Sequence, residues 1–159
     1  MRVGNGYDVH RFSDEGTLRL GGIDVPDAQR LDGHSDGDAL IHAIIDALLG
    51  AAGEGDIGRH FPPGDPATAG IDSRELLTRI VRLVVSRGFR VHNIDTTVIA
   101  ERPRLGEYLP SMREALARCL GVSASAVNVK ATTHEQLGSL GSGEAIAVMA
   151  VALLEEDVP

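Results

Sequence analysis

The pattern of apolar and polar residues changes period along this chain, which predicts alternating strands and helices. Alternating polarity or long apolar runs, both typical of strands, occur at residues 2–10, 17–20, 90–102, 127–133 and 143–155. Helical spacing occurs from about residue 35 to 52, 72 to 87 and 111 to 120. We therefore expect an α/β (α+β) fold, in which helices pack on one face of a mixed β-sheet.

The first predicted helix has signals at both ends. Ser35 is a suitable N-cap, with Asp36 and Asp38 in the first turn, where carboxylates favour the helix dipole. The predicted buried stripe comprises Leu40, Ile44, Leu48 and Ala51. The segment that follows, residues 55–66, is too rich in glycine and proline for regular structure.

Length and composition limit the class of protein. A chain of 159 residues forms one domain, 1–159, and with 43% apolar but only 3% aromatic residues its core must consist of aliphatic side chains. A net charge of −8 argues against nucleic-acid binding, which requires clustered Lys and Arg. It leaves room for a phosphate-bearing substrate, provided that metal ions supply positive charge.

The same features indicate the compartment. The single cysteine, Cys119, cannot form an intrachain disulfide. No targeting segment precedes the first strand, and the longest apolar run, residues 145–154, is too short to cross a bilayer as a helix. We expect a cytoplasmic protein with no membrane partner.

Three residues have the spacing of a metal site. Asp8 and His10 lie two apart on a predicted strand and so share one face, while His42 lies on the first helix. Two histidines and one aspartate can hold Zn²⁺ and leave a fourth position open, as catalytic zinc requires. A single histidine on an apolar helix is more often a core residue, but three coincident ligands favour the metal.

Other polar residues near this trio have two interpretations each. His34, ahead of the helix, suits hydrogen bonding to an anion, although a surface turn explains it equally well. Asp38 and Asp46 lie one turn either side of His42, and either could accept its ring N–H away from the metal. For Asp38, a role as a dipole partner in the first turn is sufficient.

A second polar run closes the strand at residues 127–133. Lys130, Thr132, Thr133 and Glu135 offer a cation, two hydroxyls and a carboxylate, which suit phosphate recognition. Glu135 could hold a hard cation such as Mg²⁺. Alternatively, the threonines are simply good strand residues.

Several segments together resemble one enzyme family over nearly the whole chain. The matching stretches are GYDVH at residues 6–10, HSDGD at 34–38, DALLGAA at 46–52, GDIG at 55–58, FP at 61–62, DSRELL at 72–77 and NVKATT at 128–133. They resemble the 2-C-methyl-D-erythritol 2,4-cyclodiphosphate synthases of the non-mevalonate route to isoprenoid precursors.

The resemblance implies a homotrimer with active sites between subunits. It implies Zn²⁺ on Asp8, His10 and His42, and Mg²⁺ or Mn²⁺ on the substrate diphosphate. Glu135 is the candidate protein ligand for that second cation. His34 and Thr133 would steady the transition state. The methylerythritol part would contact Asp56, Ile57, Gly58, Phe61, Pro62, Pro63, Gly64 and Asp65, and the cytidine diphosphate part Ala100, Pro103, Leu105, Gly106, Thr132, Thr133, His134 and Glu135. Further substrate-binding residues would be Asp8, His10, His34, Ser35 and Lys130.

The implied reaction is an intramolecular phosphoryl transfer. The 2-phosphate of 4-diphosphocytidyl-2-C-methyl-D-erythritol 2-phosphate attacks its own β-phosphorus, expels CMP and closes 2-C-methyl-D-erythritol 2,4-cyclodiphosphate. Such a reaction needs positioning and charge neutralisation rather than a protein nucleophile. The alternatives are a zinc phosphoesterase that activates water with the same trio, and a non-catalytic trimeric binding module.

This chain departs from the family pattern at residues 138–144. The family has GFxGRGE there, whereas this chain has Ser139 in place of the aromatic residue and Ser142 in place of the arginine. The residue before Glu135, commonly threonine, is His134. The zinc trio is untouched by these changes. The arginine lies near the trimer axis in the family, so its loss concerns ligands of the central cavity.

Overall fold

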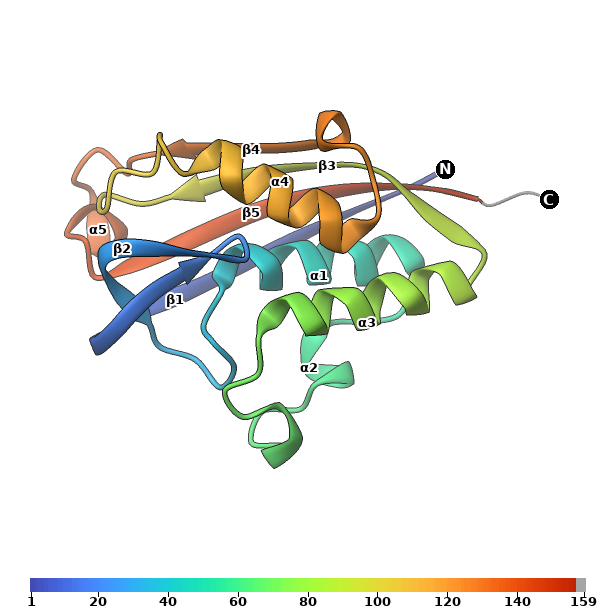
Figure 1. Cartoon of the computed structure of the whole chain (residues 1–159), viewed down its shortest axis with the longest axis horizontal. Helices are drawn as coiled ribbons and strands as arrows, with labels where there is room; N and C mark the ends of the chain where they lie inside the picture. Colours follow the sequence, from blue (N-terminus) through green and yellow to red (C-terminus); the bar gives the residue numbers. More distant parts are fainter. Residues whose placement is uncertain (157–159) are drawn as a thin grey trace.

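A five-stranded mixed sheet forms one layer of the structure, and its helices form the other (Figure 1). The computed structural model describes residues 1–156. Its longer elements are β1 (Arg2–Leu20), β2 (Ile23–Leu31), α1 (Ala39–Ala52), α3 (Ser73–Ser86), β3 (Phe89–Ile99), α4 (Leu109–Leu120), β4 (Val127–Thr132) and β5 (Ala145–Glu156). Short helical turns are α2 (Ile57–His60), η1 (Pro66–Thr68), η2 (Ala124–Ala126) and α5 (Gly138–Gly141).

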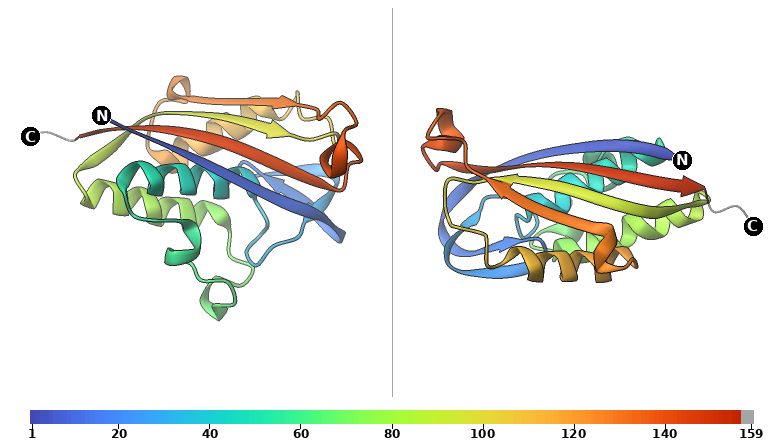
Figure 2. Two further views of the ribbon diagram at one scale, coloured as in Figure 1. Left: turned by 180° about the vertical axis from the view of Figure 1, so that it is seen from behind. Right: turned by 90° about the horizontal axis from the view of Figure 1, so that it is seen from above.

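The order of strands across the sheet is β2-β1-β5-β3-β4. β1 runs antiparallel to β2 and β5, β5 runs antiparallel to β3, and β3 runs parallel to β4. The helices α1, α3 and α4 cover one face of this sheet (Figure 2). The predicted mixed sheet with helices on one face is therefore confirmed.

The central helix α1 is more buried than its sequence indicates. The predicted stripe of Leu40, Ile44, Leu48 and Ala51 is buried, but so are most of the other residues of this helix. The sheet covers α1 on one side and α3 packs against it on another (Figure 1). A helix enclosed in this way needs no wide polar face.

Glycines allow α1 to lie unusually close to β1. A Cβ at Gly6 would stand 1.9 Å from the carbonyl oxygen of Ala43, and one at Gly4 would stand 2.1 Å from that of Ala47. No side chain fits in those spaces. Asp8 and His10 continue the same face of β1, because side chains alternate along a strand. The close approach therefore fixes where α1 lies relative to both residues.

The start of α1 differs from the sequence-based prediction. Asp38, rather than Ser35, is the N-cap, and its carboxylate accepts a hydrogen bond from the backbone nitrogen of Ile41. The same carboxylate accepts bonds from the backbone nitrogens of Gly21 at 2.9 Å and Gly22 at 2.7 Å. Complete burial raises the pKa of Asp38, although these backbone hydrogen bonds by themselves would lower it. Asp38 therefore ties the β1–β2 turn to the helix start.

Several predicted boundaries were wrong. β1 is continuous from Arg2 to Leu20, and its pairing with β2 was missed. The segment 55–66, predicted to be irregular, contains α2, whose N-cap Asp56 accepts from the backbone of Arg59. The strand predicted at 90–102 ends at Ile99, and the one predicted to begin at 143 begins at Ala145.

The sheet face opposite the helices exposes apolar side chains. Tyr7 on β1 pairs in register with Met149 on β5, and each is 55% exposed. Val3, Val9 and Val151 extend this apolar sheet face, and all three are also exposed. Within residues 1–156, no helix is both long and apolar enough to cross a bilayer.

The close contact between β1 and α1 can be tested at Gly6. Gly6→Ala should lower the free energy of unfolding by about 1–3 kcal/mol or more, because the added methyl group forces the helix away from the strand. Gly50→Ala is the matched control on α1, where the nearest outside atom is the Asn5 oxygen at 3.8 Å. It should be neutral or stabilising by up to about 1 kcal/mol. Urea unfolding measures both variants, and equal stabilities would contradict the packing argument.

Candidate metal centre and substrate pocket

Asp8, His10 and His42 converge on one point between β1 and α1. The Nδ1 atom of His42 lies 3.1 Å from Oδ2 of Asp8 and 3.3 Å from Nε2 of His10, while the latter two atoms are 2.8 Å apart. Ligands about 2.0–2.1 Å from a tetrahedral zinc stand roughly 3.3 Å from one another. The predicted trio therefore forms a group that fits a metal ion.

The geometry also orients His10. Its Nδ1 atom contacts the backbone oxygen of Asp32, so the ring can donate there and present Nε2 to the metal position. Burial by itself would lower the pKa of His10, but hydrogen bonding and attraction to Asp8 raise it. Burial would raise the pKa of Asp8, yet hydrogen bonds from His10 and His42 hold it well below its usual value.

The prediction that Asp38 or Asp46 accepts the second ring N–H of His42 is wrong. Asp38 is engaged by backbone donors at the helix start, and Asp46 accepts from the backbone nitrogen of Ile57 at 2.8 Å. The Nε2 atom of His42 instead lies 3.0 Å from the hydroxyl oxygens of both Ser35 and Ser73. The role of Ser73 was missed because that residue comes from α3, far along the chain.

A pocket of about 190 Å³ opens beside the trio. His34 lines this pocket and is exposed. Its Nε2 atom lies 2.8 Å from the backbone oxygen of Asp65, and this contact holds the ring in place. Thr68 and Leu76 complete the wall and were not predicted. Of the residues expected to bind substrate, those that line this pocket are Asp8, His10, His34, Ser35, Ile57, Gly58, Phe61 and Pro63.

Other residues expected to contact the substrate instead make hydrogen bonds to the backbone of the surrounding loop. The carboxylates of Asp56 and Asp65 accept from the backbone nitrogens of Arg59 and Ala67, and so cap α2 and η1. Pro62 and Gly64 are exposed neighbours in the same loop and do not line the pocket.

A second pocket, of about 530 Å³, lies where β3 and β4 end. Six of the residues that we predict to contact the nucleotide part line it: Ala100, Pro103, Leu105, Gly106, Thr132 and Thr133. Lys130 does not, because its Nζ is 2.5 Å from Oδ2 of Asp95. His134 and Glu135 also lie outside the lining: the ring of His134 contacts the Leu137 carbonyl, and Glu135 adopts a left-handed φ of 50° beside Thr133.

The two pockets lie on different strands of the sheet. Asp8 pairs with Val148, Val148 with Val98, and Val98 with Ala131, so three strand spacings separate the trio from the lining of the second pocket. At about 4.8 Å per spacing this amounts to roughly 14 Å. Ala131, Thr132 and Thr133, which line the second pocket, are all exposed. Within one chain, the structure does not combine the two predicted halves of the site.

The departures from the family pattern lie at α5. The hydroxyl oxygen of Ser142 lies 2.7 Å from the carboxylate of Glu144 and 3.1 Å from the backbone oxygen of Ser139, and either can accept its single proton. Both serines are exposed and border neither the trio nor its pocket.

Sequence comparison gives the family. Residues 1–155 match the YgbB family, and the chain belongs to it. A relative from Geotalea uraniireducens named 2-C-methyl-D-erythritol 2,4-cyclodiphosphate synthase is 53% identical over 98% of this chain and 99% of its own length. A synthase of the same name from Symbiobacterium thermophilum is 54% identical over 97% of this chain and 98% of its own length.

Solved structures agree with this relationship. The Plasmodium falciparum IspF–CDP complex superposes with a TM-score of 0.85 at 33% identity, over 99% of this chain and 97% of that one. The bifunctional IspDF of Campylobacter jejuni gives 0.94 at 40% identity over 98% of this chain. This chain spans only 42% of that bifunctional protein.

The pairing of Asp8 with His10 predicts a pH dependence in the metal-free protein. The pKa of Asp8 is lowered from 3.8, so its contribution is present above that pH and is lost as pH falls through the folded-state value. The pKa of His10 is raised from 6.5, so its contribution is fully present below 6.5 and is lost as pH rises through the folded-state value. The free energy of unfolding, measured with chelator present, should therefore decline above about pH 6.5.

Asp8→Asn is the control for this measurement, because it removes the charge that raises the pKa of His10. The decline should be smaller in that variant. Equal slopes in the two proteins would show that the pair does not contribute to stability.

Proposed function

We propose that this chain catalyses the metal-dependent cyclisation of 4-diphosphocytidyl-2-C-methyl-D-erythritol 2-phosphate to 2-C-methyl-D-erythritol 2,4-cyclodiphosphate, with release of CMP. It is then a phosphorus–oxygen lyase of isoprenoid precursor biosynthesis, acting as a single domain in the cytoplasm. The convergence of Asp8, His10 and His42 beside a pocket, in a chain 53% identical to a synthase of that name, carries the proposal.

The ligand set supports zinc as the metal of the trio. Two imidazole nitrogens and one carboxylate oxygen at tetrahedral spacing are typical zinc donors. Held by these three residues, zinc would act as a Lewis acid towards the substrate phosphates. For the second cation, Mg²⁺ or Mn²⁺, the exposed carboxylate of Glu135 is the protein ligand that we propose.

The protein's own residues bind and orient the substrate. Ile57, Phe61 and Leu76 give the first pocket an apolar wall that suits the carbon skeleton of methylerythritol. His34, held by Asp65, faces the same pocket and can donate to a phosphate when its ring is protonated. Thr133 offers a hydroxyl beside the second pocket, where the cytidine diphosphate would lie.

A trimer would bring the two pockets together. The metal half lies on β1 and the nucleotide half at the ends of β3 and β4, so a neighbouring subunit would complete each site. The apolar sheet face supports this arrangement, since Tyr7 and Met149 would otherwise remain in contact with water. We propose that β5 lies near the threefold axis.

The role of the metal can be tested with His42→Ala. This variant should lose its bound zinc, and CMP release should fall by about 100-fold or more, because the substrate phosphates are no longer held in place. His92→Ala is the control, since His92 on β3 pairs with Glu155 near the end of β5, seven residues along that strand from Val148, the partner of Asp8. Metal analysis and CMP release are measured together. Unchanged zinc in His42→Ala would contradict the assignment, and inorganic phosphate as the product would favour a phosphoesterase.

The trimer can be tested by sedimentation. The protein should sediment as three copies of its 16.8 kDa chain, and Met149→Glu should produce monomers by placing charge on the apolar sheet face. Val85→Glu is the matched control, because Val85 is also apolar and 54% exposed but lies on α3. A stable wild-type monomer at micromolar concentration would rule out the trimer.

A further inference from the structure

Ser73 connects a candidate metal ligand to a carboxylate outside the metal site. Its hydroxyl oxygen lies 3.0 Å from Nε2 of His42 and 2.5 Å from Oδ1 of Asp36. Ser73 is the first residue of α3 and is completely buried, and His42 is 8% exposed. Because water is almost excluded here, the hydrogen bonds that these groups make to one another determine where their protons lie.

Because a hydroxyl has a single proton, the hydrogen bonds from His42 through Ser73 to Asp36 can run in only one direction. A carboxylate only accepts hydrogen bonds, so Ser73 donates its proton to Asp36 over the 2.5 Å contact. The oxygen of Ser73 then has only lone pairs to offer to His42. Nε2 of His42 must therefore carry the ring proton, which leaves the lone pair of Nδ1 directed at Asp8 and His10.

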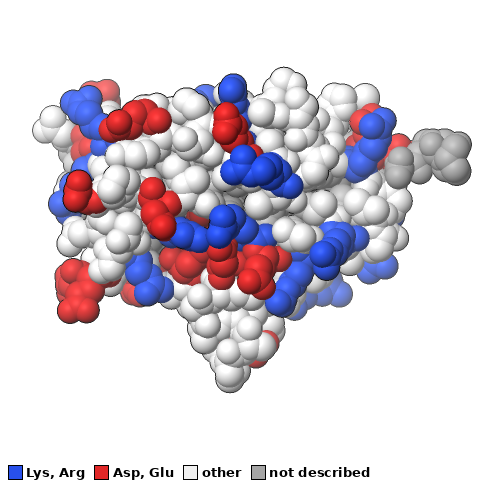
Figure 3. All heavy atoms as spheres, in the orientation of Figure 1, with Lys and Arg blue, Asp and Glu red and all other residues white. Residues whose placement is uncertain are grey.

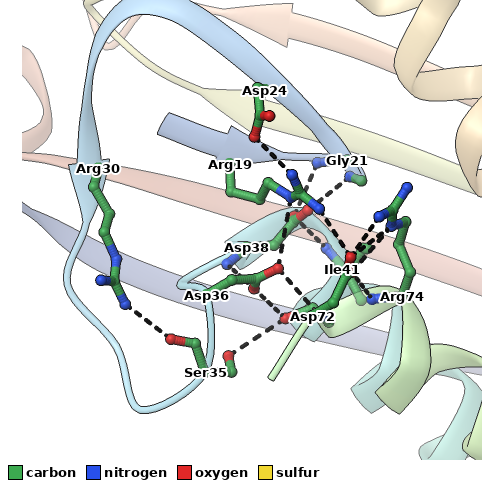
Figure 4. Close-up of polar contacts among 12 residues, drawn as sticks. Arg19, Gly21, Asp24, Arg30, Ser35, Asp36, Asp38, Ile41, Asp72 and Arg74 are labelled. Atoms are coloured by element: carbon green, nitrogen blue, oxygen red, sulfur yellow. Dashed lines mark hydrogen bonds and ion pairs between the residues drawn. The ribbon is translucent and has the colours of Figure 1, made fainter. Parts of the chain in front are cut away.

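Asp36 is itself held firmly in place. Its carboxylate also accepts from the backbone nitrogens of Ser73 at 3.0 Å and Asp38 at 3.2 Å. Arg19 lies beside Asp36 while bonding to Asp24 and Asp72 (Figure 4). The Nε atom of Arg19 is buried and has no hydrogen-bond partner among residues 1–156, and it lies 3.8 Å from Oδ2 of Asp36.

This polar cluster reaches the surface near the first turn of α3, where acidic and basic side chains adjoin (Figure 3). Asp72 bonds to both Arg19 and Arg74, which lowers the pKa of Asp72 to about 2, the bond from Arg74 being the largest cause. The carboxylate of Asp72 makes no hydrogen bond to the Ser73 hydroxyl or to His42, whereas that of Asp36 accepts from the Ser73 hydroxyl.

We propose that Ser73 and Asp36 are positioning residues that hold His42 in the tautomer that a metal requires. The proposal rests on the metal site proposed above. Asp8 lies 3.1 Å from Nδ1 of His42 and, without metal, attracts the ring proton to that nitrogen. The His42–Ser73–Asp36 chain opposes this shift, and Ser35, 3.0 Å from Nε2, provides a second acceptor. Metal then binds without first having to move the proton.

Zinc affinity, measured by competition with a chromophoric chelator, tests the proposal. Ser73→Ala should weaken zinc binding by about 10-fold, and Ser73→Ala combined with Ser35→Ala by up to about 100-fold. Asp36→Asn should also weaken it, because an amide cannot accept from both the backbone nitrogen and the hydroxyl of Ser73.

Two variants serve as matched controls. Asp72→Asn removes the same charge beside Arg19, and Thr78→Ala removes a hydroxyl that bonds to the backbone of the same helix. Both should retain wild-type zinc affinity. If Asp72→Asn weakens zinc binding as much as Asp36→Asn, the loss of a negative charge near Arg19 is sufficient to explain the effect. The proposed hydrogen bonds from His42 through Ser73 to Asp36 are then refuted.

A spectroscopic measurement separates positioning from simple loss of structure. In the zinc-loaded protein labelled with ¹⁵N-histidine, the Nε2 proton of His42 should give a signal protected from exchange with water, and Ser73→Ala should lose that protection. Equal zinc affinity and equal protection in wild type and Ser73→Ala would overturn the proposal. A wild-type protein that binds no zinc would instead overturn the proposed metal site itself.

Discussion

The close contact between the backbones of β1 and α1 is the constraint on which the candidate site depends. Gly4 and Gly6 leave no side chain between the strand and the carbonyl oxygens of Ala43 and Ala47. Residues of even number on β1 then face the helix, so Asp8 and His10 point towards His42. Any side chain at Gly6 would widen this separation, whereas the three ligand atoms must lie about 3.3 Å apart to share a zinc ion.

The order of the strands explains why the proposed trimer would matter for function. β1 carries metal ligands, and β5 and β3 separate it from the strand whose end lines the second pocket. Tyr7 on β1 and Met149 on β5 are exposed on the sheet face away from the helices. This apolar sheet face offers a surface for association. Association through that face would join the binding halves of different subunits.

The sequence predicted best what depends on local period. The two-residue spacing of Asp8 and His10 and the helical placement of His42 were sufficient to identify the trio, and the fold class followed from the alternation of strands and helices. The role of Asp38 was misjudged, because the Gly21 and Gly22 nitrogens that bind its carboxylate come from a turn on another element. Ser73 was missed for the same reason, since nothing near His42 in the sequence indicates a partner on α3.

Co-expression of two inactive variants tests most directly whether each site is shared between subunits. His42→Ala removes a ligand from the metal half, and Gly106→Trp fills the second pocket at a position with open space around it. In mixed trimers a site is intact when one subunit supplies the metal half and its neighbour the nucleotide half, so CMP release should recover to roughly a quarter of the wild-type rate. A mixture no more active than either variant alone would contradict the account.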